Sequence, residues 1–116
     1  MTVVTWSALP AVEVFPGITR QVLDGELQTM VRYLYQPGAT FPEHSHPEEQ
    51  ITVVVSGQIE FLVDGKVIML GAGQAATIPP GVLHGARVIG NQPVETFNAL
   101  SPQRLNHPAP DTEMGR

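Results

Sequence analysis

The stretch that decides the fold is "GATFPEHSHPEEQITVVVSG", residues 38–57. It contains two of the four histidines of the chain, His44 and His46, one residue apart, and Gln50 follows them. Alternate residues of a β-strand point to the same face of the sheet. On a strand both imidazoles are therefore predicted to share one face, and Gln50 shares it if the chain stays extended through Pro47 or bends there and recovers.

The segments on either side of this stretch also alternate with period two. "TMVRYLY" (29–35) places alternate residues on opposite faces, and "QIEFLVDGKVIML" (58–70) predicts a hairpin because Asp64-Gly65 is a two-residue turn signal. Shorter strands are predicted in residues 50–56, 74–79, 86–90 and 94–100. No segment combines a helix start cap, an apolar stripe and a stop. Short strands joined by Gly/Pro turns predict an all-β sandwich or barrel.

The composition limits the class of protein and its partners. A chain of 116 residues predicts one domain, assigned here to residues 1–104, with a Pro-rich tail at 105–116 that is either a loose end or an arm packed on a partner chain. The net charge of −5 without a basic cluster argues against nucleic acid as a partner. No apolar run is long enough to span a membrane, and the first residues lack the pattern of a signal peptide. The expectation is a cytoplasmic protein.

A second stretch, "GQAATIPPGVLHG" (73–85), adds a third histidine after a rigid Pro79-Pro80-Gly81 turn. Taken singly, each histidine could be an ordinary strand or turn residue. Three imidazoles (His44, His46 and His84) and one side-chain oxygen are enough to hold one divalent ion and leave coordination positions open.

The spacing of both stretches resembles the two motifs of the cupin family. Five residues separate Gly38 from His44, six separate Gln50 from Gly57, and Gly73, Pro79, Gly81 and His84 follow in the order of the second motif. Val88 occupies the position where that motif usually closes with Asn. The resemblance implies a single-domain cupin, a double-stranded β-helix or jelly-roll barrel. It also implies a metal site made by His44, His46, Gln50 and His84.

Position 50 is the one where the family usually has a glutamate ligand, and the spacing from Gly57 favours Gln50 over Glu49. Three neutral imidazoles and a neutral amide leave the charge of the ion uncancelled, which favours an anionic substrate and Lewis-acid chemistry. Such a ligand set suits Ni, Zn, Mn, Fe or Cu and does not choose among them.

Four further segments resemble the small cupins of the KdgF type, namely "PGITRQVL" (16–23), "HSHPEEQIT" (44–52), "IPPGVLHGA" (78–86) and "SPQR" (101–104). The resemblance implies opening of the ring of a 4,5-unsaturated uronate. It gives Asn98 and Arg104 as the catalytic candidates, although Asn98 stands where the family has an acidic residue and Leu100 where it has a phenylalanine. Arg104 is the candidate anchor for a carboxylate.

Three readings of the function stay open from the sequence. The first is a metal-dependent enzyme acting by proton transfer on a small anionic organic acid or sugar acid. The second is a metal-dependent dioxygenase, and the third is a small-molecule binding or sensor module without catalysis. A homodimer is expected, because an open antiparallel sandwich has strand edges to protect.

Overall fold

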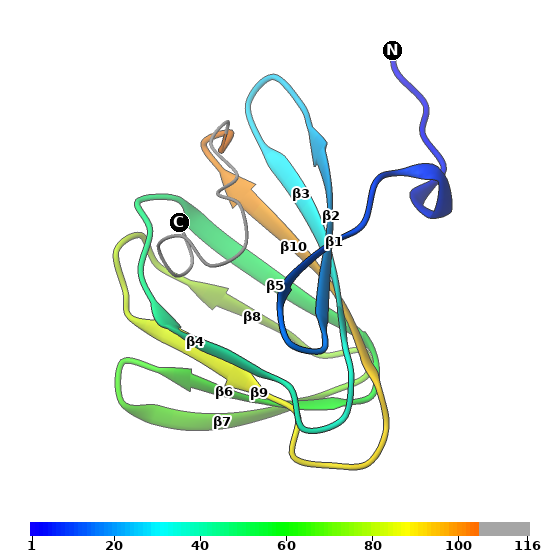
Figure 1. The fold of residues 1–116 in the computed structure, drawn as a ribbon. Helices are drawn as coiled ribbons and strands as arrows, with labels where there is room; N and C mark the ends of the chain where they lie inside the picture. The colour runs from blue at the N-terminus through cyan, green and yellow to red at the C-terminus, as the bar shows by residue number, and fades with distance from the viewer. Residues whose placement is uncertain (105–116) are drawn as a thin grey trace.

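The computed structural model describes residues 1–104 and consists of two antiparallel β-sheets (Figure 1). A short 3-10 turn, η1, precedes ten strands. Their bounds are η1 (Trp6–Ala8), β1 (Val12–Phe15), β2 (Ile18–Asp24), β3 (Thr29–Tyr35), β4 (Thr40–His44), β5 (Glu49–Ser56), β6 (Gln58–Val63), β7 (Lys66–Gly71), β8 (Ala75–Ile78), β9 (His84–Arg87) and β10 (Val94–Ser101). The prediction of an all-β domain is confirmed. The tail predicted at 105–116 lies outside the described residues.

The six-stranded sheet has the order β1-β2-β3-β10-β5-β8, and the four-stranded sheet has the order β4-β9-β6-β7. The chain crosses from one sheet to the other between β3 and β4, β4 and β5, β5 and β6, β7 and β8, β8 and β9, and β9 and β10. Because of these crossings, β4 and β9 lie side by side in one sheet while β5 and β10 lie side by side in the other. The two predicted histidine motifs meet through this pairing.

The apolar core lies between the sheets and follows the period-two pattern. Ile18 and Val94 of the larger sheet are buried against Ile59 and Phe61 of the smaller one. Along β3 the predicted alternation holds, with Thr29, Val31 and Tyr35 buried. The apolar face of each sheet is thus removed from water by the other sheet, which is the main source of stability in such a sandwich.

Two turns show why the sequence needs glycine there. Asp64 and Gly65 have φ values of 50° and 77° between β6 and β7, as expected for the predicted hairpin turn. Gly57 has a φ of 83°, and a Cβ at this position would lie 2.5 Å from the carbonyl oxygen of Pro93. The glycine that closes the first motif therefore permits a close approach between the β5–β6 turn and the start of β10.

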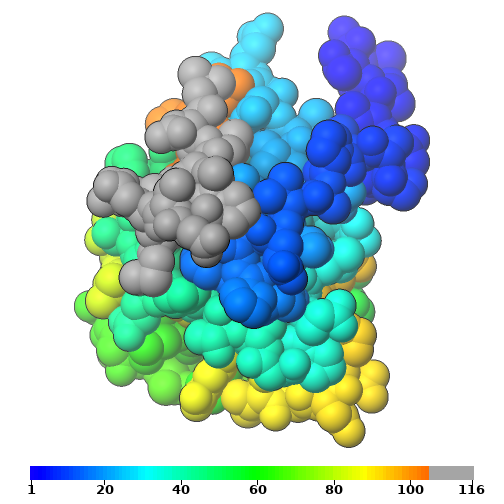
Figure 2. Space-filling view, in the orientation of Figure 1, coloured from blue at the N-terminus to red at the C-terminus, as the bar shows by residue number. Residues whose placement is uncertain are grey.

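The N-terminal residues lie across the outer face of the larger sheet. Trp6 packs edge-on against Phe97 with ring centroids 5.1 Å apart, and Gln21 donates to the carbonyl oxygens of Trp6 and Leu9. In Figure 2 the first residues (dark blue) project at the upper right, at the opposite end of the molecule from the β9–β10 connection (yellow). No helix in the part of the chain that the structure describes has the length and apolarity needed to cross a membrane.

Candidate metal centre

The pairing of β4 with β9 brings the two histidine motifs together. His44 is the last residue of β4 and lies opposite His84, the first residue of β9. His46 lies beyond the end of β4, in the loop that leads to β5, so the prediction that it shares a strand with His44 was wrong. Pro47 cannot donate to a strand ladder, and the chain turns here. The His46 carbonyl instead accepts from Gly81 N at 2.8 Å, which ties this loop to the turn before His84.

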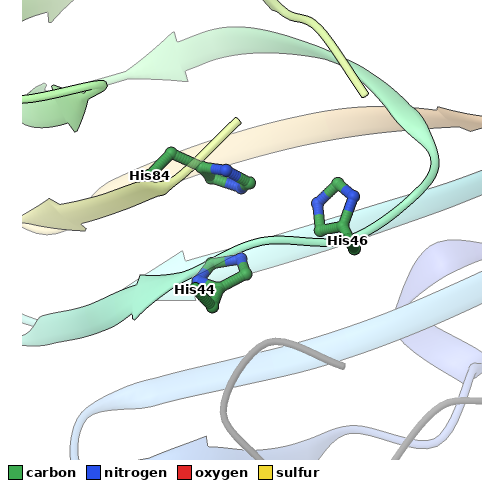
Figure 3. Close-up of side chains that lie close together, drawn as sticks. All are labelled: His44, His46 and His84. Atoms are coloured by element: carbon green, nitrogen blue, oxygen red, sulfur yellow. The ribbon is translucent and has the colours of Figure 1, made fainter. Parts of the chain in front are cut away.

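The three imidazole rings point toward one another (Figure 3). Each ring nitrogen Nδ1 lies 2.9–3.0 Å from a backbone carbonyl two residues away, that of Pro42, Glu48 or Val82. A carbonyl oxygen can only accept, so each Nδ1 carries the proton and each Nε2 keeps its lone pair. One nitrogen from each ring can be chosen so that all lie within 4.8 Å of one another. This arrangement suits coordination of one cation through Nε2.

Burial keeps two of these imidazoles, those of His44 and His84, neutral. It lowers the pKa of His44 to about 3, with a further contribution from the neighbouring His84, and burial also lowers the pKa of His84. The Nε2 atom of His84 is buried without a hydrogen-bond partner among the described residues. A buried lone pair without a partner costs free energy unless a ligand satisfies it, so these residues fit a bound metal ion.

Gln50 is the second residue of β5, and its side chain lies beside the histidines. Its Oε1 atom is 3.0 Å from Nε2 of His46, and the side chain is buried. Glu49 is exposed, whereas Glu48 turns toward Arg104. Of the three residues, the structure therefore brings the Gln50 side chain to the imidazole nitrogens, and its role as a ligand remains a proposal.

Asn98 lies behind Gln50 on β10 and is 3% exposed. Its Oδ1 accepts from Thr52 Oγ1 at 2.7 Å and from Gln50 Nε2 at 3.3 Å. Glu95 lies on the opposite face of β10, as the alternation predicts, and pairs with Arg32 at 2.6 Å. No carboxylate of β10 within the described chain therefore reaches the site.

Arg104 lies close to the histidine cluster. Its Nη1 atom is 3.0 Å from a carboxylate oxygen of Glu48, and that same oxygen is 3.5 Å from Nδ1 of His46. The positive charge of Arg104 also helps to lower the pKa of His44. The late arginine predicted as a carboxylate anchor is thus placed beside the imidazoles, with Glu48 between them.

Arg20 and Tyr33 belong to the same region and were missed as site residues by the sequence reasoning. They lie opposite each other in the β2–β3 pairing and so point to the same face as the buried Val31 and Tyr35. Burial raises the pKa of the Tyr33 phenol, and the charges of Arg20 and Arg104 partly oppose this rise. The sequence did contain a signal for Arg20, because it is a charged residue at a position that shares the inward face of its strand with Ile18 and Val22.

Aromatic rings connect Tyr33 to the histidines. Phe41 contacts Tyr33 with centroids 5.4 Å apart and His44 with centroids 4.8 Å apart, and Phe15 packs edge-on against Phe41. His44 therefore lies against the ring of Phe41, and His46 lies beside the ion pair of Glu48 with Arg104. Such a site suits a small molecule that carries both a charged group and an oxygen to be polarised.

Comparison with known proteins agrees with this geometry. A region of 34% identity over 70 residues, 60% of this chain, matches the polyketide synthase CurC of Streptomyces cyaneus, and this region is 46% of that protein. The solved structure of an RmlC-like cupin from Shewanella frigidimarina is 27% identical with a TM-score of 0.80, covering 88% of this chain and 91% of that one. The structure of KdgF from Halomonas sp. is 28% identical with a TM-score of 0.76, covering 83% and 88% respectively.

The family model described as "Cupin domain" matches residues 31–100, from β3 to β10. This range contains the three converging histidines, Gln50 and both glycine-rich turns of the two motifs. The two-sheet fold and the family expected from the motif spacing are confirmed. The chain belongs to the cupin family.

Proposed function

We propose that this protein is a metal-dependent enzyme that acts on a small anionic organic acid or sugar acid, with ring opening of a 4,5-unsaturated uronate as the specific reaction. The observation that carries the proposal is the convergence of three imidazoles and the Gln50 amide oxygen. The similarity to KdgF from Halomonas sp. supports the choice of substrate class.

The charge of the ligand set favours an anionic substrate. Three imidazoles and one amide leave the charge of a divalent ion uncancelled. Such an ion, when bound, supplies a Lewis acid that polarises an oxygen of the substrate. The set admits Ni, Zn, Mn, Fe or Cu, and one ion per chain is expected from a single group of three histidines among the described residues.

Arg104 is proposed to orient the carboxylate of the substrate. Glu48 holds the guanidinium in place at 3.0 Å, close enough to His44 for its charge to affect that pKa. The phenol of Tyr33 stays protonated at neutral pH because burial raises its pKa, so it is the candidate donor to a substrate oxygen. Thr52 and Val54 share the inward face of β5 with Gln50 and are buried, whereas Ser56 is exposed and does not line the interior.

Uronate ring opening fits this site because it is an isomerisation. The bond between the anomeric carbon and the ring oxygen breaks, the anomeric hydroxyl loses its proton, and a proton is added to the carbon–carbon double bond at C4. Atoms and electrons balance without an oxidant, so the reaction needs proton transfer and stabilisation of negative charge on oxygen.

The test is the ultraviolet absorbance of the conjugated enol ether in 4,5-unsaturated galacturonate, followed with the metal-loaded protein. We expect faster loss than the spontaneous decay, and no acceleration with His84→Ala. An oxygen electrode in the same reaction separates ring opening from a dioxygenase, because ring opening consumes no oxygen. A metal-loaded protein that binds the substrate without accelerating its decay would instead favour a binding or sensor module.

Arg104→Gln tests the carboxylate anchor. Loss of a charge-assisted bond costs about 1.5–3 kcal/mol, so KM is expected to rise about 10-fold or more. Arg87→Gln is the matched control, because Arg87 is an exposed residue whose ion pair with Glu60 at 2.6 Å lies on the face of the smaller sheet that points away from His84. Equal KM values for the two variants would contradict this role for Arg104.

A second candidate is acid–base chemistry on a carbonyl compound related to polyketides. The 34% match to the polyketide synthase CurC favours it. The ring of Phe41 beside His44, with Phe15 and Tyr33 packed against it, would suit such an apolar substrate. A β-diketone incubated with the metal-loaded protein tests this candidate through the loss of its enol absorbance.

We also propose that the protein forms a homodimer through the outer face of the larger sheet. Ile51, Val53 and Val55 of β5 point outward and are 41%, 40% and 46% exposed. Their side chains form a continuous apolar row on a strand near the sheet edge. Burying such a row against a second copy would remove apolar surface from water.

A further inference from the structure

Four buried polar side chains form a hydrogen-bonded chain behind the metal site. Gln50 and Thr52 on β5 and Thr96 and Asn98 on β10 all point into the interior and are 8%, 0%, 0% and 3% exposed. Asn98 lies directly opposite Thr52 in the strand pairing. A buried polar group that lacks a hydrogen-bond partner costs free energy. The orientation of each of these side chains is therefore determined by the bonds that it makes to the others.

The direction of this chain is set at its far end. The Nδ2 atom of Asn98 lies 3.2 Å from the carbonyl oxygen of Val31 and 3.0 Å from Oγ1 of Thr96. A carbonyl oxygen can only accept a hydrogen bond, so it selects the NH₂ group of the amide and not its oxygen. The Oδ1 atom of Asn98 must therefore point the other way, toward Thr52 and Gln50.

The same logic continues along the chain to Gln50. Thr52 Oγ1 donates its single proton to Asn98 Oδ1 at 2.7 Å, so it can only accept from Gln50. Gln50 Nε2 donates to Thr52 Oγ1 at 2.8 Å and reaches Asn98 Oδ1 at 3.3 Å. With its NH₂ group held there, the Gln50 amide has its oxygen turned toward the imidazoles.

At the near end, two lone pairs face each other. Nδ1 of His46 donates to the carbonyl of Glu48 at 3.0 Å, which leaves Nε2 of His46 as an acceptor. Oε1 of Gln50 is also an acceptor and lies 3.0 Å from that Nε2. Two acceptors at this distance repel unless a cation lies between or beside them. The chain of hydrogen bonds thus holds an amide oxygen in the orientation that a metal ion requires.

We propose that Thr52 and Asn98 are positioning residues that fix the Gln50 amide with its oxygen toward the three histidines. The proposal rests on the metal site of the proposed function and adds which atom of Gln50 binds. In the reverse orientation Gln50 would present an NH₂ group, which has no lone pair for a metal. Asn98 has its two N–H groups and its oxygen engaged in this chain, which is consistent with positioning and not with proton transfer.

The test is metal titration of three proteins, using Co²⁺ and its visible absorption spectrum: the wild type, Thr52→Val and Thr52→Ser. Valine has the shape of threonine without the hydroxyl, so the chain is broken and the Gln50 amide is free to turn. We expect Thr52→Val to bind Co²⁺ about 10- to 100-fold more weakly, with an altered spectrum. Thr52→Ser keeps the hydroxyl and is expected to retain the wild-type spectrum.

A double-mutant cycle separates positioning from a general structural effect. If Thr52 acts through Gln50, then Thr52→Val combined with Gln50→Ala should bind Co²⁺ no more weakly than Gln50→Ala alone. A further loss in the double variant, equal to that of Thr52→Val alone, would overturn the proposal. If Thr52→Val fails to fold, Thr52→Ala replaces it in the same cycle.

A measurement on the metal-free protein keeps this proposal distinct from the proposed function. Nuclear Overhauser contacts of the Gln50 NH₂ protons are expected to the Thr52 side chain and not to the His46 ring. The opposite pattern would overturn the proposal even if metal binds. A wild type that binds no Co²⁺, with the expected contacts present, would instead defeat the metal-dependent function and leave the amide orientation standing.

Discussion

Replacing His84 by phenylalanine should stabilise the metal-free protein while it abolishes metal binding. His84 is 2% exposed, and its Nε2 atom has no hydrogen-bond partner among the described residues. An unsatisfied buried polar atom costs about 1–3 kcal/mol. A phenyl ring of similar shape removes this cost. It also loses the bond from Nδ1 to the Val82 carbonyl, which is worth about 0.5–1.5 kcal/mol.

Without metal, His84→Phe is expected to raise the free energy of unfolding by about 1 kcal/mol. This is the difference between the middle values of the two ranges. The wild type should gain about 2.7 kcal/mol when the free metal concentration is 100 times its dissociation constant, and the variant should gain nothing. The order of stability should therefore reverse when metal is added. Denaturant unfolding, with chelator and with metal, measures both quantities.

His44→Phe is the matched control for this experiment. His44 belongs to the same cluster, but its Nε2 is not among the buried unsatisfied atoms of the described chain. This variant should lose the metal effect without gaining stability in chelator. The reasoning would be refuted if metal-free His84→Phe, still folded, unfolded at least 1 kcal/mol more easily than the wild type. It would also be refuted if His84→Phe retained the stabilisation by metal.

Three further changes test the ligand, the strand spacing and the dimer. Gln50→Ala should weaken metal binding more than Glu49→Ala does, because the Glu49 side chain is exposed. Calorimetric titration with the metal measures both affinities, and equal losses would contradict the assignment of Gln50 as the ligand. In Gly85→Ala the new Cβ would lie 2.9 Å and 3.1 Å from main-chain atoms of β4. This should cost about 1–3 kcal/mol of stability and weaken metal binding by separating the strands that carry two of the imidazoles. Gly90→Ala, where no described atom lies within 4 Å, should change neither property. Light scattering should give a dimer mass for the wild type and a monomer mass for Val53→Asp, and a monomeric wild type would exclude the proposed interface.

The sequence by itself determined the fold class and which three histidines form the cluster. Period-two alternation and the Asp64-Gly65 turn predict strands and a hairpin because both are local consequences of backbone geometry. The spacing of His44 and His84 within two glycine-rich stretches indicated the family. These features depend on neighbouring residues along the chain, so they can be read without the tertiary structure.

The tertiary structure decided which groups surround the cluster and which of their atoms face it. His46 lies off its predicted strand because Pro47 turns the chain, and Arg20 joins the site region only through the pairing of β2 with β3. The orientation of the Gln50 amide depends on Asn98, 48 residues away in the sequence. Hydrogen bonds between distant strands have no local signature, because their geometry is fixed by how the sheet assembles.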